Sequence, residues 1–128
     1  MTESKELPTL EADGSAGLIK LEISIGEICR IEVDSKSFEG SDLFAALIAL
    51  RSNLESNQRR ICCNGSRKDV FPSGMAREMS RGRKAYALKL GVRPSSEDVI
   101  DIFQAAGPMQ IGTVDEQKEF FDQWKQSF

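Results

Sequence analysis

A cationic stretch in the middle of the chain is the part of this sequence most suggestive of chemistry. Between residues 59 and 84 the chain has eight arginine and lysine residues and two acids, whereas its 128 residues together have a net charge of −3. The same stretch has glycines at 65, 74 and 82, and reads "FPSGMAREMSRGRKAY" from residue 71 to residue 86. Arginine side chains can bind phosphate with two parallel hydrogen bonds, so the composition is compatible with a ligand loop.

The spacing of these residues favours no particular ligand. The sequence has no P-loop or dinucleotide-binding spacing and no helix-turn-helix signature, and the stretch has one tyrosine in place of a series of stacking aromatic residues. Three interpretations stay open, namely arginines that pair with acids of the same domain, a protein-binding surface, and a nucleic-acid-binding surface over residues 59–84. The candidate partner-binding residues are Arg67, Lys68, Arg77, Arg81, Arg83 and Lys84.

Catalytic groups are scarce. The sequence has no histidine, which removes the commonest general base and the commonest metal ligand. Asp98 with Asp101, and Glu116 with Glu119, are spaced as pairs on one helix face, but such pairs are abundant on solvated surfaces and have no companion base here. We therefore expect no enzymatic activity and no cofactor.

The three cysteines, Cys29, Cys62 and Cys63, form no recognisable framework. Their number is odd, and two of them are neighbours whose side chains would point to opposite faces of a strand. They could not easily converge on one zinc ion. We expect three reduced structural thiols and no metal site.

The N-terminal residues are acidic and polar, and they lack the cationic start and apolar core of a secretory signal. No apolar run approaches the length of about 18 residues that a membrane span needs. We expect a cytoplasmic protein with no membrane role. Residues 1–17 offer only Leu7 and Leu10 for burial and end in "DGSAG", so we predict a flexible acidic tail there and a single domain over residues 18–128.

The first half of that domain has clear periodic patterns. Apolar residues alternate with polar ones over residues 18–25 and again over residues 29–34, as in two half-buried strands. A three-residue loop between them would pair Ile23 with Ile31, and Leu21 with Val33. A helix follows, with Ser41 as its predicted N-cap and one apolar stripe. That stripe contains Leu43, Leu47, Leu50 and Leu54.

The second half is less regular. "RRICC" reads as a short strand closed by an Asn64-Gly65 turn, with "KDVF" as its possible partner, and "RKAYALKL" reads as a further strand. Residues 96–106 fit either a helix or a capped turn that runs into a strand, and we favour the second. Thr113 and Glu116 have the spacing of a capping box, which predicts a final helix. Its aromatic face, predicted to pack on the core, contains Phe120, Phe121, Trp124 and Phe128.

A short helix is also predicted after Ser73, inside the cationic stretch. Met75 and Met79 lie four residues apart and are predicted to fill the core, while the arginines at 77, 81 and 83 face water or a partner. Gly82 would permit a left-handed exit into the next strand. On this interpretation the stretch is a structural connection that presents cations.

The order of these elements predicts a single α+β domain, with an antiparallel or mixed sheet and helices packed mainly on one face. It does not predict the topology further.

Residues 61–127 resemble a known group of small bacterial proteins. The resemblance rests on four short motifs, and some members of the group look like immunity proteins of polymorphic or contact-dependent toxin systems. The motifs are Pro72-Ser73-Gly74-Met75, Lys84-Ala85-Tyr86, Asp101-Ile102-Phe103 and Thr113-Val114-Asp115-Glu116-Gln117. The resemblance implies a cytoplasmic protein that binds and neutralises a cognate toxin domain and has no chemistry of its own. It implies no catalytic residue, and it leaves the oligomeric state open.

Overall fold

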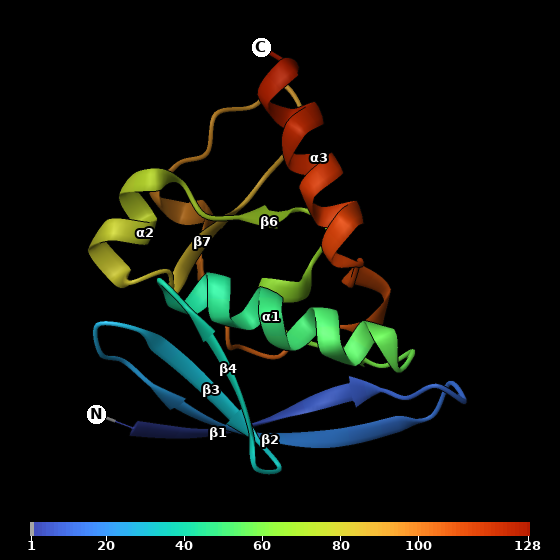
Figure 1. Cartoon of the computed structure of the whole chain (residues 1–128). Helices are drawn as coiled ribbons and strands as arrows, with labels where there is room; N and C mark the ends of the chain where they lie inside the picture. Colours follow the sequence, from blue (N-terminus) through green and yellow to red (C-terminus); the bar gives the residue numbers. More distant parts are fainter. Residues whose placement is uncertain (1) are drawn as a thin grey trace.

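The computed structural model describes residues 2–128, which fold as a single α+β domain (Figure 1). The larger of two antiparallel sheets has five strands in the order β4-β3-β2-β1-β5. These strands are β1 (Thr2–Leu10), β2 (Ala16–Ser24), β3 (Cys29–Val33), β4 (Lys36–Gly40) and β5 (Arg60–Ile61). The predicted fold class is therefore confirmed.

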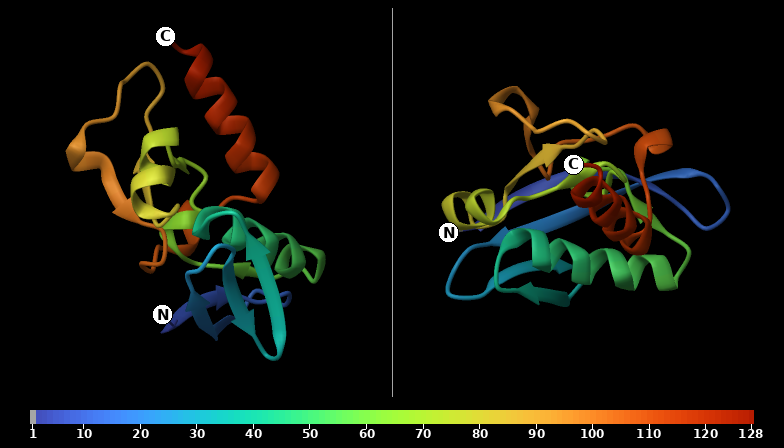
Figure 2. Two further views of the ribbon diagram at one scale, coloured as in Figure 1. Left: turned by 60° about the vertical axis from the view of Figure 1, so that its left-hand side comes forward. Right: turned by 90° about the horizontal axis from the view of Figure 1, so that it is seen from above.

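The smaller sheet has three strands in the order β6-β7-β8. They are β6 (Val70–Phe71), β7 (Lys84–Ala87) and β8 (Val99–Asp101), and the helices are α1 (Leu43–Ser56), α2 (Gly74–Ser80) and α3 (Val114–Gln126). Short 3-10 turns lie at Asn64–Ser66, Ser96–Asp98 and Pro108–Gln110. Figures 1 and 2 show the helices and the smaller sheet on one side of the larger sheet. Within residues 2–128, no helix has the length and apolar character that crossing a membrane requires.

The predicted N-terminal tail is wrong for residues 2–10. They form β1, which pairs with β2 from Thr2 opposite Ser24 to Leu10 opposite Ala16, and with β5 on its other edge. Leu7 is 1% exposed and lies opposite Ile19. The polar composition of this segment hid the strand, because backbone hydrogen bonds to two neighbouring strands need few apolar side chains.

The register of the β2–β3 hairpin is confirmed. Ile23 lies opposite Ile31, as the odd-numbered apolar residues of both strands require. The inner face of the sheet is covered by α1, whose leucine stripe is buried. The N-cap of α1 is Asp42 and not Ser41, because the Asp42 carboxylate accepts a hydrogen bond from the N–H of Ala45 at 2.8 Å.

The predicted pairing of "RRICC" with "KDVF" is wrong. Val70 and Phe71 pair instead with Ala87 and Tyr86 of β7, and β5 pairs with β1. The Asn64-Gly65 turn separates the two sheets, and it packs so closely on α1 that a side chain at Gly65 would collide with Leu47. A local turn signal could not show that the two flanking strands belong to different sheets.

The end of the chain follows the sequence patterns. Residues 96–101 are a capped 3-10 turn that runs into β8, as favoured above. The capping box of α3 is present, with Glu116 N–H donating to Thr113 Oγ1 at 3.0 Å and Thr113 N–H donating to Glu116 Oε1 at 2.8 Å. The C-terminal end of α3 extends away from the larger sheet (Figure 2).

Candidate functional site

Residues 72–83, the last part of the cationic stretch, connect β6 to β7. Ser73 caps α2 by accepting a hydrogen bond from the N–H of Ala76 at 3.0 Å. After α2 the chain turns through left-handed conformations at Arg81 and Gly82, with φ of 56° and 79°. A Cβ on Gly82 would lie 2.7 Å from the carboxyl carbon of Asp42, so only glycine fits this approach to α1. The predicted role of Gly82 is confirmed.

Arg77 faces inward, contrary to the sequence prediction. Its guanidinium forms an ion pair with Asp42 at 3.2 Å, and it lies 5.2 Å from the ring centre of Phe44 and 5.9 Å from that of Phe71. Asp42 is also the N-cap of α1, so one carboxylate joins the two helices. The backbone completes the junction, since Leu43 N–H donates to the Arg81 carbonyl at 2.7 Å.

Met75 and Met79 face outward, and their predicted burial is therefore wrong. They are 71% and 81% exposed. The spacing of four correctly predicted that both methionines share a helix face, but it assigned that face to the core. When Arg77 faces inward, its guanidinium pairs with the Asp42 carboxylate and also lies over two aromatic rings. A methionine at this position could not pair with the carboxylate.

The other arginines of the candidate set are also engaged within the chain. Arg83 bonds the carboxylates of Glu3 at 2.9 Å and Asp101 at 3.1 Å. The hydrogen bond from Arg83 is the main cause that lowers the pKa of Glu3. Arg67 holds Asp69 through two bonds of 3.0 and 2.9 Å.

Arg81, Lys68 and Lys84 differ from these. Arg81 donates to the Gly26 carbonyl at 2.6 Å and contacts the Cys29 sulfur at 3.4 Å, and it has no carboxylate partner among residues 2–128. Lys68 and Lys84 are exposed and form no ion pair with any residue from 2 to 128. Intramolecular pairing therefore describes Arg67, Arg77 and Arg83, whereas the two lysines stay available to a partner.

Exposed apolar side chains lie on α2 and on the β2–β3 turn. Arg81 ties the end of α2 to that turn, where Ile25 and Ile28 are 37% and 53% exposed. We call Ile25, Ile28, Met75 and Met79 the α2 surface. A hollow of about 240 Å³ beside Ile25 is lined by Thr2, Glu3, Ile23, Ile25 and Arg83.

One buried network holds the cationic region in place and was missed by the sequence analysis. Arg51 of α1 is 2% exposed and donates to the carbonyls of Gly65 and Gly112 at 3.1 and 3.2 Å, and to Gln117 Oε1 at 2.6 Å. Gln117 in turn donates to the carbonyls of Gly65 and Arg67. The available signal was an arginine in the leucine stripe, four residues after Leu47.

The remaining carboxylate and thiol side chains within residues 2–128 form no metal-binding cluster. No three carboxylate or thiol side chains of this part of the chain lie close enough together to hold a metal ion. The cysteines are unpaired and buried, and burial raises the pKa of the Cys63 thiol. Asp98 accepts from the Ser95 N–H and Glu116 from the Thr113 N–H, so both serve as helix or turn caps.

Comparison with known proteins adds no relative, since neither the scan against protein-family models nor the search of curated proteins finds a match. The resemblance of residues 61–127 to immunity proteins therefore stays a prediction. The α2 surface is the main candidate for a binding site on the exposed surface of the molecule.

Proposed function

We propose that this chain is a non-enzymatic cytoplasmic binding protein, namely an immunity protein that neutralises a cognate bacterial toxin domain by direct binding. The observation that carries the proposal is the exposure of Met75 and Met79 on α2, which Arg81 ties to the turn that bears the exposed Ile25 and Ile28. Methionine is flexible and polarisable, and it is favoured where a surface adapts to the shape of a partner. A cluster of exposed apolar side chains is typical of a protein-binding site.

The charges around α2 support a protein partner over a nucleic acid. A phosphate backbone would have to compete with Asp42 for Arg77, with Asp69 for Arg67, and with two carboxylates for Arg83. Each exchange would leave an acid without its partner, at a cost comparable to the new contact. Within residues 59–84, the cations that form no ion pair with the described residues are Arg60, Lys68, Arg81 and Lys84, and these four would supply few counterion-releasing contacts.

The proposed mechanism is occlusion of the toxin surface. Apolar anchors at the centre of an interface supply most of its affinity, while charges at its rim accelerate encounter and select the partner. In this chain the α2 surface would supply the anchors, and Arg81 and Lys84 would lie at the rim. No group of the chain needs to react with the toxin.

The proposal predicts that a toxin-like domain is encoded beside the gene, and coexpression with that domain tests it. Growth should be restored by the wild-type chain and by Met109→Asp, since Met109 is 97% exposed and lies outside the α2 surface. Growth should not be restored by the Met75→Asp/Met79→Asp double variant, because charged groups would have to be buried at the centre of the interface. If the wild-type chain neither restores growth nor forms a complex with the toxin, the proposal is wrong. Equal loss in the Met109→Asp variant would reject the α2 surface.

A further inference from the structure

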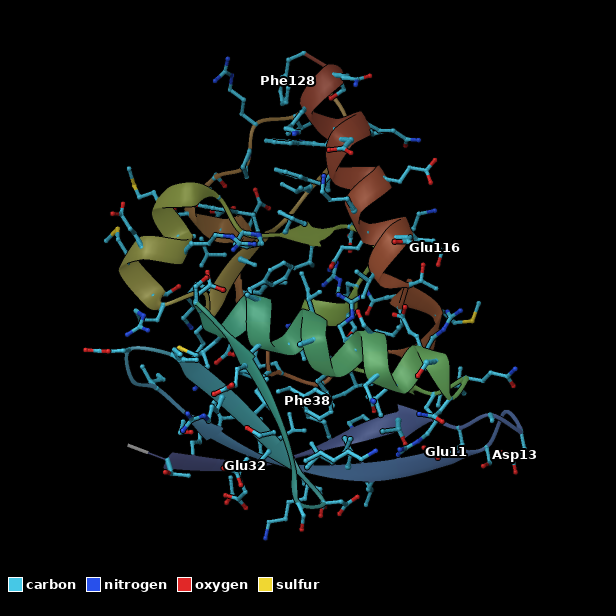
Figure 3. All side chains as sticks on the ribbon, viewed as in Figure 1. Glu11, Asp13, Glu32, Phe38, Glu116 and Phe128 are labelled. Atoms are coloured by element: carbon cyan, nitrogen blue, oxygen red, sulfur yellow. The ribbon has the colours of Figure 1, made fainter. Side chains whose placement is uncertain are left out.

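The outer end of α3 forms a second exposed surface that the α2 proposal does not use. An aromatic row leads to it from the core. Phe121 stacks on Phe71 with ring centres 4.0 Å apart, Trp124 lies 6.0 Å beyond Phe121, and Phe128 meets Trp124 edge to face at 5.1 Å. Figure 3 shows Phe128 at the tip of this helix, far from the larger sheet.

The loop after β7 holds this end of α3 in position. The indole N–H of Trp124 donates to the Val92 carbonyl at 3.1 Å, and the Gly91 N–H donates to Ser127 Oγ at 2.7 Å. Gly91 has φ of 75°, which a glycine adopts without strain. Because the indole N–H of Trp124 is already bonded, its ring offers a packing surface to a further ligand and no hydrogen-bond donor.

An open hollow of about 440 Å³ lies between these two segments. Its lining residues, which we call the α3 shelf, are Arg93, Pro94, Trp124, Lys125 and Phe128. The volume falls in the range of ordinary ligand sites, and two further apolar side chains, Leu90 and Val92, are about half exposed on the adjoining loop.

The charge of the shelf is positive. Arg93 lies 5.6 Å from the ring centre of Phe128, and Lys125 lies 4.8 Å from that of Phe121. Lys125 is 3.4 Å from Asp122, whereas Arg93 forms no ion pair with any residue in the described range 2–128. A guanidinium beside an aromatic ring keeps its N–H groups available for a carboxylate.

We propose that the α3 shelf binds a segment of another protein in which an aromatic or aliphatic side chain adjoins a carboxylate. The apolar side chain packs on Trp124 and Pro94, and the carboxylate pairs with Arg93. Charge complementarity selects this occupant, because a cationic edge on an apolar shelf disfavours a basic segment. The site is distinct from the α2 surface and does not depend on the toxin.

The chain has a single tryptophan, so the indole N–H resonance of Trp124 reports on the shelf alone. The experiment titrates the labelled protein with acetyl-Glu-Phe-Leu-Glu-amide, and in parallel with its glutamine analogue and its Ala-Ala analogue. We expect saturable, millimolar binding of the first peptide and binding of both analogues that is weaker by roughly fivefold or more, because each lacks one of the two contacts.

Two variants complete the test. Arg93→Gln should remove the preference for the acidic peptide over its glutamine analogue. Lys20→Gln, which deletes the same charge from the larger sheet, should leave that preference unchanged. The proposal is overturned if the Trp124 resonance does not respond to the acidic peptide, or if Arg93→Gln preserves the preference. These peptides contain no toxin sequence, so failure here is separate from failure of the proposed immunity function.

Discussion

Arg51 is a buried side chain of α1 that joins this helix to three other segments through hydrogen bonds. Its guanidinium has three acceptors on three different segments and no carboxylate partner within residues 2–128. Burial lowers the pKa of this guanidinium, yet an arginine stays charged near neutral pH. The site therefore holds a buried cation that only neutral oxygen atoms solvate.

Replacing Arg51 should be among the most destabilising single changes. Arg51→Met keeps much of the volume but leaves the Gly112 carbonyl and Gln117 Oε1 without their donor. We expect a loss of about 3 kcal/mol or more in the free energy of unfolding, measured by urea denaturation. Arg30→Met is the matched control, since the Arg30–Glu39 pair is exposed, and it should leave the free energy of unfolding nearly unchanged. Equal losses in the two variants would contradict the assigned role of Arg51.

Substitution of Arg77 should reduce stability more than substitution of Met79, which is the reverse of what the sequence pattern predicts. Arg77→Ala removes the partner of the buried Asp42 and the contacts with Phe44 and Phe71, so we expect a loss of about 1 to 3 kcal/mol. Met79→Ala should change stability by less than about 0.5 kcal/mol, because the side chain is 81% exposed. Thermal or urea unfolding of both variants measures the difference, and a larger loss for Met79→Ala would restore the sequence prediction.

Single residues of α1 and α2 show which features helical spacing predicts and which it does not. Helical spacing correctly placed Met75 and Met79 on one face of α2, and the leucine stripe of α1 correctly predicted its buried face. Periodicity alone cannot choose the buried face of a helix as short as α2. That choice depends on Asp42, which approaches α2 only when the chain has folded.

At the scale of elements, β1 is the strand whose position differs most from expectation. It lies between β2 and β5, so the larger sheet would be divided without it. Its sequence contains few β-branched residues, and only Leu7 and Thr9 are buried. A strand that is completed by long-range pairing carries little local signal, whereas hairpins and capped helices carry their signals locally. This explains why the β2–β3 register, α1 and α3 were predicted correctly.

The role of β1 can be tested by replacing one leucine on β1 and one on the neighbouring strand β2. Leu7→Asn places an amide in the core, at a position 1% exposed, and should cost about 2 kcal/mol or more. Leu18→Asn on β2 lies on the outer face at 67% exposed and should change stability by less than about 0.5 kcal/mol. Chemical denaturation gives both values. A flexible tail over residues 1–17 would instead make Leu7→Asn harmless.

At the scale of the whole molecule, ion pairs connect segments that are distant in sequence. Arg83 joins β1 to β8 through Glu3 and Asp101, and Arg59 joins the start of β5 to Glu11 beyond β1. Two arginines of the cationic middle are thereby paired with acids from distant parts of the sequence. The charge asymmetry along the chain is visible in the sequence, and it leaves internal pairing as one interpretation. The pairing of Arg59 with Glu11 and of Arg83 with Glu3 is not visible there, because it depends on the placement of β1.

These pairs predict a dependence of stability on pH. The pKa of Glu3 is lowered mainly by its hydrogen bond with Arg83, and that of Glu11 mainly by its bond with Thr9. A lowered carboxyl pKa contributes stability that is complete above the ordinary pKa of a glutamate and is lost as the pH falls through the folded-state value. Urea denaturation over that acidic range should therefore show falling stability.

Glu3→Gln is the variant that isolates this contribution. It should be less stable than wild type at neutral pH, and the difference should shrink in acid, where Glu3 of the wild type is protonated. Glu78→Gln, at an exposed residue of α2 outside these pairs, should follow the wild-type pH profile. A difference between Glu3→Gln and wild type that does not change with pH would contradict the role given to the Glu3–Arg83 pair.

Titration calorimetry with the purified toxin domain is the sharpest test of the proposed binding through the α2 surface. We expect the Met75→Asp/Met79→Asp variant to bind at least roughly tenfold more weakly than wild type, with an unchanged free energy of unfolding. Met109→Asp should bind as wild type does. Wild-type affinity in the double variant, or no measurable affinity in the wild-type chain, would contradict the proposed toxin binding through the α2 surface.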